Sequence, residues 1–500
     1  MKQKLQILLA MVLFTIAFPI LSNAYDFEIA GINYTIVSLA NKTCAVTANK
    51  DDNCYKGDIV IPNTVSYNNQ EVTVVGINQS AFYSCKELTS ITLPETIEWI
   101  GEQSEGSSAT GAFEYCEALQ TFIIPSSCTL IGDRAFYGCR SLTSIKFPNS
   151  VSSIGKLAFA LSDLKSLILP NIENIGEFAF SNCSHLTSVE ITGKIQKIKK
   201  GVFRDCSSLK EILLPSEIES IYTYAFYNCT QLQSIILPDS LNYLGAYAFG
   251  KCSSLISLDL PKKTREVGSN FITENNLITS LTFGDVKFIG VGTGGYDNSR
   301  IYSYEGCEQL KELRFEKPKY GSDYIERTAF DPETKTESYS GCGWGEYFDN
   351  IETLYVNRKL SITYAPKLEK LVLGSSVGYV PWNNPQLWGN LKTIVSYALY
   401  PPVITYDKEP FSTEQYLNIT LMVPNEAIEA YKKNADWNSF WNIEGFDPEE
   451  AGIHNNDSVY NTTIRHENSR YNLQGQPVSE DYKGVVIVRL SDGSSKKIMQ

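Results

Sequence analysis

The sequence has few histidines and an acidic balance of charge. Three histidines (His185, His454 and His466) occur in 500 residues, which leaves few side chains for histidine-based metal or acid–base chemistry. Lys and Arg number 43 against 56 Asp and Glu, so the formal net charge is −13. Because nucleic acids and anionic membranes are bound by clustered basic side chains, this balance argues against either of them as a partner.

Long apolar runs are also scarce. The run at residues 7–21 is shorter than the roughly 20 residues that span a bilayer, and it follows Lys2 and Lys4. Ser22-Asn23-Ala24 then offers the small residues that a signal peptidase accepts, so residues 1–24 are predicted to be a secretory signal cleaved after Ala24. We expect an exported mature chain, secreted or at the bacterial cell surface, with no transmembrane segment.

The chain is rich in internal repetition. The template Ala-Phe-x-x-Cys-x-x-Leu-x-Ser-Ile-x-Leu-Pro recurs, and its cysteines are spaced by 23 residues from Cys183 to Cys252. Ile-x-Leu before proline alternates with period two, which predicts a short strand with both apolar side chains inward. A following Ile-Gly pair predicts a second extended piece, and Ala-Phe-x-x-Cys predicts a helical turn. One such repeat cannot bury its apolar face, whereas a stack of them can.

This template resembles the bacterial leucine-rich repeats of the Bacteroides surface-protein (BspA-like) type, most completely over residues 81–261. The predicted fold is an α/β repeat, namely a leucine-rich-repeat solenoid with parallel short strands on the concave face, capped at both ends and followed by a small C-terminal β module. The last segment resembles the C-terminal sorting tail of type IX secretion. The predicted divisions are 25–74 for the N-terminal cap, 75–402 for the solenoid (irregular after 262), 403–446 for the C-terminal cap, 447–458 for a linker and 459–500 for the β module.

The cysteines fall into two groups. Those in the repeat slot are predicted to be small buried thiols, because side chains in register point the same way and not toward one another. Cys44 and Cys54, ten residues apart in the N-terminal cap, are a possible disulfide, and two free thiols are equally compatible with the spacing. No C-x-x-C occurs and no histidine stands at ligand spacing, so no metal site is predicted.

Two motif matches do not support catalysis. Residues 290–295 fit G-x-G-x-x-G, but a loop follows where a dinucleotide site requires a helix. Residues 374–378 fit G-x-S-x-G around Ser376, but no helix is predicted after the serine, as a nucleophile elbow requires. We therefore expect no cofactor and no enzymatic activity, with catalysis at an unrecognised site as the remaining alternative.

A ligand site is expected where the repeats are irregular. Residues 296–406 are rich in Tyr and Trp, and a non-repeat insertion separates Phe315 from Ile351. Insertions in a solenoid map to one face, and large aromatic side chains suit recognition of a protein or glycan, although at any single position packing is the competing interpretation. The candidate binding residues are Tyr320, Tyr324, Tyr339, Trp344, Tyr347, Tyr379, Trp382 and Trp388. Trp437, Phe440 and Trp441 are instead expected to pack over the C-terminal end.

The family resemblance implies display or secretion at the cell surface and binding by the solenoid. The predicted function is non-catalytic adhesion or binding, with a host matrix protein or a surface glycan as partner. The alternative is a structural or assembly component of the cell envelope, retained through its tail. The oligomeric state is left open.

Overall fold

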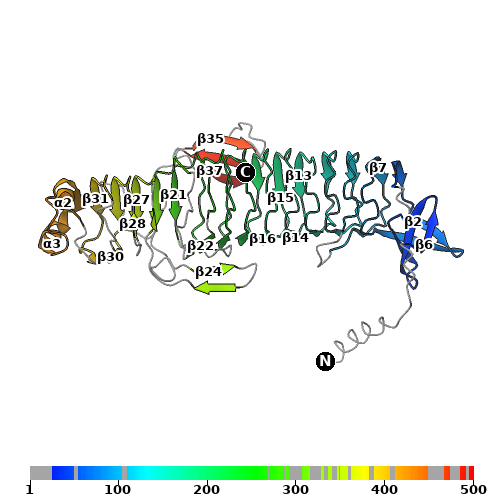
Figure 1. The fold of residues 1–500 in the computed structure, drawn as a ribbon, viewed down its shortest axis with the longest axis horizontal. Helices are drawn as coiled ribbons and strands as arrows, with labels where there is room; N and C mark the ends of the chain where they lie inside the picture. Colours follow the sequence, from blue (N-terminus) through cyan, green and yellow to red (C-terminus); the bar gives the residue numbers. More distant parts are fainter. Residues whose placement is uncertain are drawn as a thin grey trace, which may run out of the picture.

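The protein is described by a computed structural model, in which the chain forms an elongated rod (Figure 1). The predicted signal segment (1–24) and most of the predicted linker lie outside the described residues. The structure describes residues 25–49, 54–103, 110–268, 270–284, 288–291, 307–315, 328–331, 336–339, 346–347, 350–357, 362–381, 388–405, 411–448, 467–472, 485–490 and 495–499. Two rows of short strands run along the rod, which confirms the predicted solenoid of stacked repeats.

The first row, here called the Ile-x-Leu face, is built from the strands that precede the repeat proline. Its pairs are parallel and in register, as where Leu167 lies opposite Val189. The row comprises β4 (Gly57–Val60), β7 (Leu88–Thr92), β9 (Thr121–Ile123), β11 (Ser144–Lys146), β13 (Ser166–Leu169), β15 (Ser188–Ile191), β17 (Glu211–Leu213), β21 (Ser280–Phe283), β23 (Glu312–Phe315), β27 (Thr353–Val356), β29 (Lys370–Leu373), β31 (Thr393–Ser396), β33 (Thr420–Pro424) and β34 (Asn442–Phe446).

The second row, the Ile-Gly face, is made of shorter parallel pairs. Many of its strands are two residues long, because the glycine that follows lets neighbouring backbones approach closely and turn. The row comprises β8 (Trp99–Ile100), β10 (Leu130–Ile131), β12 (Ser153–Ile154), β14 (Asn174–Ile175), β16 (Lys197–Ile198), β18 (Ser220–Ile221), β19 (Tyr243–Leu244), β20 (Glu266–Gly268), β22 (Phe288–Val291), β26 (Glu346–Tyr347), β28 (Ile362–Tyr364), β30 (Tyr379–Pro381) and β32 (Val403–Thr405).

The Ala-Phe-x-x-Cys segments form the third side of each repeat, and the prediction of a helical turn there is wrong. Two residues per repeat are left-handed, for example Tyr224 (φ 59°) before Ala-Phe and Asn228 (φ 61°) before the cysteine. A right-handed helix cannot contain such residues. The backbone instead bonds to the next repeat, so that the Phe226 N–H donates to the Ala248 carbonyl at 2.8 Å.

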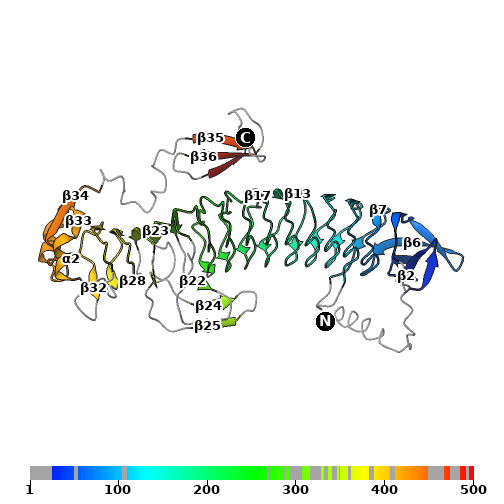
Figure 2. The same cartoon turned by 45° about the horizontal axis from the view of Figure 1, so that its top comes forward.

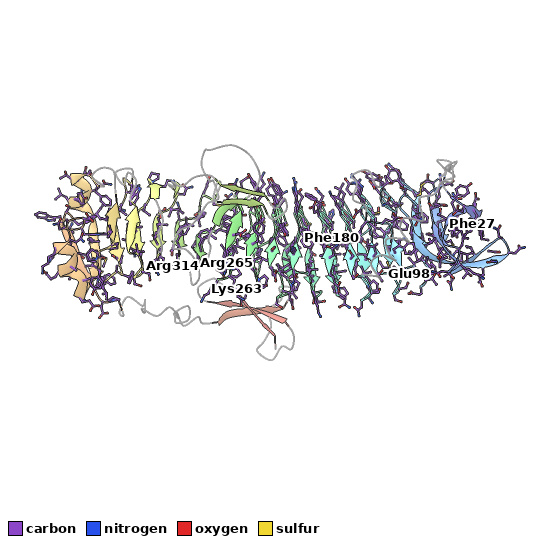
Figure 3. All side chains as sticks on the ribbon, turned by 90° about the horizontal axis from the view of Figure 1, so that it is seen from below. Phe27, Glu98, Phe180, Lys263, Arg265 and Arg314 are labelled. Carbon is purple, nitrogen blue, oxygen red and sulfur yellow. A yellow bond between two sulfur atoms is a disulfide. The ribbon has the colours of Figure 1, made fainter. Side chains whose placement is uncertain are left out.

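A column of phenylalanine rings fills the centre of the regular repeats. Adjacent ring centroids lie 4.8 to 5.7 Å apart, and their planes agree within 5° to 12°. Figure 3 labels one of them, Phe180, in the middle of the rod. Every ring in the column is fully buried, so each one is shared by two repeats that could not bury it alone. The column comprises Phe82, Phe113, Phe136, Phe159, Phe180, Phe203, Phe226 and Phe249.

Except for Cys85, the repeat cysteines are buried thiols as predicted, and they have a polar role that the sequence did not reveal. Cys206 Sγ donates to the Phe180 carbonyl at 3.2 Å, and Cys116, Cys139, Cys183, Cys229 and Cys252 likewise donate to a phenylalanine carbonyl of the previous repeat. Asn275 stands in this slot one repeat after Cys252 and donates to the Phe249 carbonyl at 2.8 Å. Burial raises the pKa of the Cys206 thiol well above its usual range, so the thiol stays protonated and can donate.

The predicted Cys44–Cys54 disulfide is wrong. Cys54 is bonded to Cys85, with their Cα atoms 5.0 Å apart, and Cys44 is a free buried thiol. Cys44 lies in β3 (Thr43–Val46), where parallel pairing with β6 (Gln70–Ile77) sets its side chain in the core. Cys85 is the first cysteine of the repeat slot, and the residue that stacks before it is Cys54. The disulfide therefore joins the N-terminal segment to the first repeat.

Different elements close the two ends of the rod (Figure 2). At the N-terminal end, β1 (Phe27–Ile29), β2 (Ile32–Ser38), β3, β5 (Thr64–Tyr67) and β6 join one sheet with the Ile-Gly strands. At the other end lie α2 (Thr413–Asn418), the short 3-10 helix η2 (Asn425–Ala427) and α3 (Ile428–Lys433). Trp437 and Phe440 are buried there as expected, but Trp441 is 77% exposed, so its predicted packing role is wrong.

Two further small sheets lie outside the rows. β24 (Thr328–Asp331) and β25 (Thr336–Tyr339) form an antiparallel hairpin. β35 (Glu467–Asn472), β36 (Val485–Leu490) and β37 (Ser495–Met499) form an antiparallel sheet near the C-terminus. Among the described residues, neither short helix nor any other is long and apolar enough to cross a bilayer.

Candidate binding groove on the Ile-x-Leu face

An open groove of about 970 Å³ lies on the Ile-x-Leu face of four consecutive repeats, over β13, β15, β17 and residues 234–239. These strands belong to the regular half of the rod, near its middle (Figures 1 and 2). The lining residues are Ser166, Leu167, Ile168, Ser188, Val189, Glu190, Ile191, Thr192, Glu211, Ile212, Leu213, Leu214, Pro215, Ser216, Glu217, Ser234, Ile235, Ile236, Leu237, Pro238 and Asp239.

Strand alternation decides which of these side chains a ligand would meet. Leu167 and Val189 point into the core and are buried, so their neighbours in sequence point outward. Ile168 is accordingly 61% exposed. The outward row across the groove reads Ile168, Glu190, Leu213 and Ile236. Aliphatic side chains at outward positions contribute nothing to the column of rings, which makes this row a candidate contact surface.

The charged residues of the groove are all acidic. Glu190, Glu211, Glu217 and Asp239 line it, and no Lys or Arg does. Burial raises the pKa of the Glu211 carboxyl, which is half-buried among the strands. Basic residues lie beyond both ends of the groove, at Lys146 on β11 and at the exposed Lys262, Lys263 and Arg265.

The sheet is interrupted inside the groove. β17 is the last member of the sheet β13-β15-β17, and residues 234–237 of the next repeat form no strand. No backbone hydrogen bond joins residues 211–214 to residues 234–237, two segments that are both fully described. The repeats remain stacked beneath, since the Phe203 and Phe226 rings are 5.6 Å apart. The interruption is therefore confined to the surface, where it leaves backbone polar groups available to a bound molecule.

The lining of the groove contains carboxylates but no His, Cys or Lys beside them. In the described ranges, no cluster of three or more His, Cys, Asp or Glu side chains is placed to hold a metal ion.

Ser376, the serine of the G-x-S-x-G match, lies in a second and smaller hollow. This hollow of about 320 Å³ is lined by Ser375, Ser376, Val377, Gly378, Tyr397, Ala398, Leu399 and Tyr400. No acid or base stands among these residues, and the backbone after Ser376 enters β30 and not a helix. The geometry of a nucleophile elbow is absent from this described segment.

The aromatic residues predicted to bind ligand are not gathered into a site by the described structure. Trp388 is fully buried and packs edge-to-face with Phe411, with centroids 6.3 Å apart, so its prediction as a binding residue is wrong. Tyr339, Tyr347 and Tyr379 have their backbones in β25, β26 and β30. The other four lie outside the described residues: Tyr320, Tyr324, Trp344 and Trp382.

The outward row of the C-terminal repeats is used for packing. Tyr355, Val372 and Val395 occupy the outward positions of β27, β29 and β31, yet all three are buried in a cluster with Tyr397, Met422 and Phe446. The Arg314 guanidinium lies 4.1 Å from the centre of the Tyr355 ring. Tyr355, Tyr397 and Phe446 therefore form a second packing layer, whereas Tyr400 is 84% exposed.

Sequence reasoning missed the groove, although a signal was present. That signal is the outward position of Ile-x-Leu, which holds Ile168, Leu213 and Ile236 in the groove, where an aliphatic residue has no packing function in the template. The same position holds Ile123 outside the groove, so reading it across the repeats identifies exposed apolar positions and not the groove alone.

Comparison with known proteins supports the repeat assignment. Six copies of the BspA type leucine rich repeat region match residues 52–104, 106–232 and 173–311, just over half of the chain. A leucine-rich repeat protein from Bacteroides ovatus is similar in fold, with a TM-score of 0.51 and 23% identity over 85% of this chain and 100% of that chain. Two other solved structures have lower TM-scores. A leucine rich repeat protein from T. pallidum has a TM-score of 0.35 and 24% identity over 46% of this chain and 91% of that chain. A leucine rich cell surface protein from Faecalibacterium prausnitzii has a TM-score of 0.33 and 19% identity over 75% of this chain and 95% of that chain. No curated protein matches the chain.

Proposed function

Since the chain belongs to the BspA-type leucine-rich repeat family, we propose that it is an exported, non-catalytic adhesion protein that binds a protein partner in the Ile-x-Leu groove. The observation that carries this proposal is the groove itself, where the exposed Ile168 and the half-buried Leu213 and Ile236 stand on a face that the core does not need. Apolar side chains set among polar ones on a concave surface are typical of recognition sites. The predicted secretory signal supports an extracellular role.

The test is a binding screen with a substitution in the groove. The chain from Tyr25 onward is measured against immobilised host matrix proteins and glycans, beside the double variant Ile168→Asp, Ile236→Asp. The proposal expects at least one protein ligand whose binding is lost in the double variant, because desolvated aliphatic contacts would be replaced by charge. Ile123→Asp is the matched control, since Ile123 is outward on β9, 80% exposed and outside the groove.

Circular dichroism and thermal unfolding establish that both variants keep the fold. Binding that survives the double variant would move the site elsewhere on the rod. A screen in which no protein or glycan binds at micromolar concentration would remove the adhesion proposal.

A structural role in the cell envelope is a second candidate, and the antiparallel sheet β35–β37 favours it. A small β module after a solenoid suits attachment or sorting, as the predicted resemblance to a type IX secretion tail also suggests. Deletion of residues 452–500 would then release the chain from the envelope while leaving groove binding unchanged. Retention of the truncated chain at the surface would argue against this candidate.

A further inference from the structure

We propose that the groove selects an extended peptide segment that presents, on one face, a basic side chain between two apolar ones. This inference rests on the proposed binding function and narrows it to one class of partner. It follows from the charges of the groove, from the arrangement of its outward side chains and from its length.

The four groove carboxylates differ from other exposed carboxylates of the rod. Elsewhere a Lys from a neighbouring repeat commonly neutralises the acid, as in Lys156–Glu177, Lys251–Glu274 and Lys392–Glu369. Among the residues that the structure describes, Glu190, Glu211, Glu217 and Asp239 form no ion pair with a Lys or Arg. The groove therefore presents uncompensated negative charge, bounded on both sides by basic residues that would repel a cation placed outside it.

Glu190 and Glu211 lie on adjacent strands. In the β15–β17 register Ser188 lies opposite Glu211 and Glu190 lies opposite Leu213, so the two residues occupy diagonal positions on the same outward face. A cation placed between them would be attracted by both carboxylates. A Lys or Arg of a bound segment is the group that fits this position.

The apolar members of the row set the rest of the pattern. Ile168 lies on one side of the two carboxylates, and Leu213 and Ile236 lie on the other. A segment lying along the row would meet apolar, acidic and again apolar contacts in turn. In an extended segment every second side chain points to the same face, so the pattern Leu-x-Lys-x-Leu presents apolar, basic and apolar groups to the groove in that order.

The length of the groove sets the length of the segment. Four strands separated by about 4.8 Å span roughly 14 Å, which about four to five extended residues cover at about 3.3 Å each. The interrupted sheet between β17 and residues 234–237 adds backbone donors and acceptors for an extended chain. A peptide of about six residues therefore covers the whole outward row, with its terminal residues lying beyond the groove.

The experiment measures fluorescence anisotropy of the labelled hexapeptide Ser-Leu-Ser-Lys-Ser-Leu, whose Leu, Lys and Leu side chains share one face when it is extended, with the chain from Tyr25 onward. A peptide with Glu in place of Lys should bind at least about tenfold more weakly. A peptide of the same composition, with its Lys and Leu in one block, tests this order and should also bind more weakly. Raising the salt from about 50 mM to about 500 mM should weaken binding of the Lys peptide, because exposed charges are screened.

The double variant Glu190→Gln, Glu211→Gln should lower the affinity for this peptide at least about fivefold. Glu444→Gln is the matched control, since Glu444 is exposed on β34 of the same face and lies far along the chain from the groove.

Equal binding of the Lys, Glu and block peptides would overturn the inference, and so would a double variant that binds as tightly as the unchanged chain. If a matrix protein binds and Ile168→Asp, Ile236→Asp abolishes that binding while the Lys peptide fails, the proposed function stands and this inference falls. If no ligand depends on the groove, both fall.

Discussion

The regular repeats and the repeats after residue 262 bury their side chains differently. Between Phe82 and Phe249 one inward column of rings and one row of thiol hydrogen bonds form the core. The outward row of those strands is left to solvent. Around Tyr355 and Val395 the outward row is itself buried in a second apolar cluster.

The difference shows that composition alone does not distinguish binding from packing. Aromatic residues in a repeat protein can form a ligand site or an additional packing layer, and Tyr355, Tyr397 and Phe446 of the C-terminal half form such a layer. The regular half has a uniform core, so a departure from the template at an outward position carries information about binding. The exposed aliphatic groups of the groove stand in that half.

Removing one ring from the column should have the largest effect. Phe180→Ala opens a cavity between two repeats and should lower the free energy of unfolding by about 3–5 kcal/mol, since Phe180 is fully buried and stacked on both faces. Denaturant unfolding followed by circular dichroism measures it. A loss under about 1 kcal/mol would mean that neighbouring repeats collapse into the cavity and that the column is not a fixed structure.

The Cys54–Cys85 disulfide should stabilise the N-terminal end of the rod. Cys54→Ser with Cys85→Ser should cost about 2–5 kcal/mol there, because a closed loop of 31 residues is released in the unfolded chain. Hydrogen exchange should show the loss of protection in β4 and β7 but none around β29. Peptide mapping under non-reducing conditions provides the control, and a Cys44–Cys54 link would contradict the pairing.

The contrast between the two halves can be tested at one matched position. Val395→Ser removes a buried outward side chain on β31 and should destabilise the fold by about 1–3 kcal/mol, through lost apolar burial and a buried hydroxyl. Ile168→Ser occupies the equivalent position on β13 and should change stability by less than about 0.5 kcal/mol, because Ile168 is exposed. Equal effects, measured by chemical denaturation, would remove the distinction between the halves.

The repeat cysteines contribute both a hydrogen bond and apolar packing to stability, and two substitutions of Cys206 separate these contributions. Cys206→Ala leaves the Phe180 carbonyl without its donor and should cost about 1–3 kcal/mol. Cys206→Ser keeps a donor and should cost less, as the natural serine at Ser162 in the same slot suggests. If Ser and Ala variants melt at the same temperature, the hydrogen bond contributes nothing to the stability of the stack.

The smallest predicted effect depends on pH and concerns Glu211. Burial raises the pKa of this carboxyl in the folded chain, so the folded state binds a proton more tightly than the unfolded state does. The charge is then destabilising above the unfolded pKa, and Glu211→Gln should raise the melting temperature slightly at pH 7. The gain should fade as the pH drops below the usual range of a glutamate. A gain that persists in acid would point to packing and not to charge.

The sequence predicted the stack but not every local conformation in it. The Ile-x-Leu strands, the buried thiols and the packing of Trp437 follow from template positions, since a repeat presents the same side chain to the same environment each time. The helical turn failed because the left-handed residues before Ala-Phe and before Cys are held by bonds to the next repeat, which no single repeat contains. Trp441 and Trp388 exchanged their expected roles for the same reason, because contacts distant in sequence decide whether an isolated aromatic residue is buried.

By itself the sequence determined the period, the inward faces and the acidic charge, because these depend on residue type and spacing alone. Only the tertiary structure decided that Cys85 takes Cys54 as its partner, because the stacking of the N-terminal segment on the first repeat brings their Cα atoms within reach. Only the tertiary structure decided that the outward side chain of Ile168 is exposed whereas that of Val395 is buried. Exposure is set by what neighbouring strands place above a side chain, and that depends on residues several repeats away.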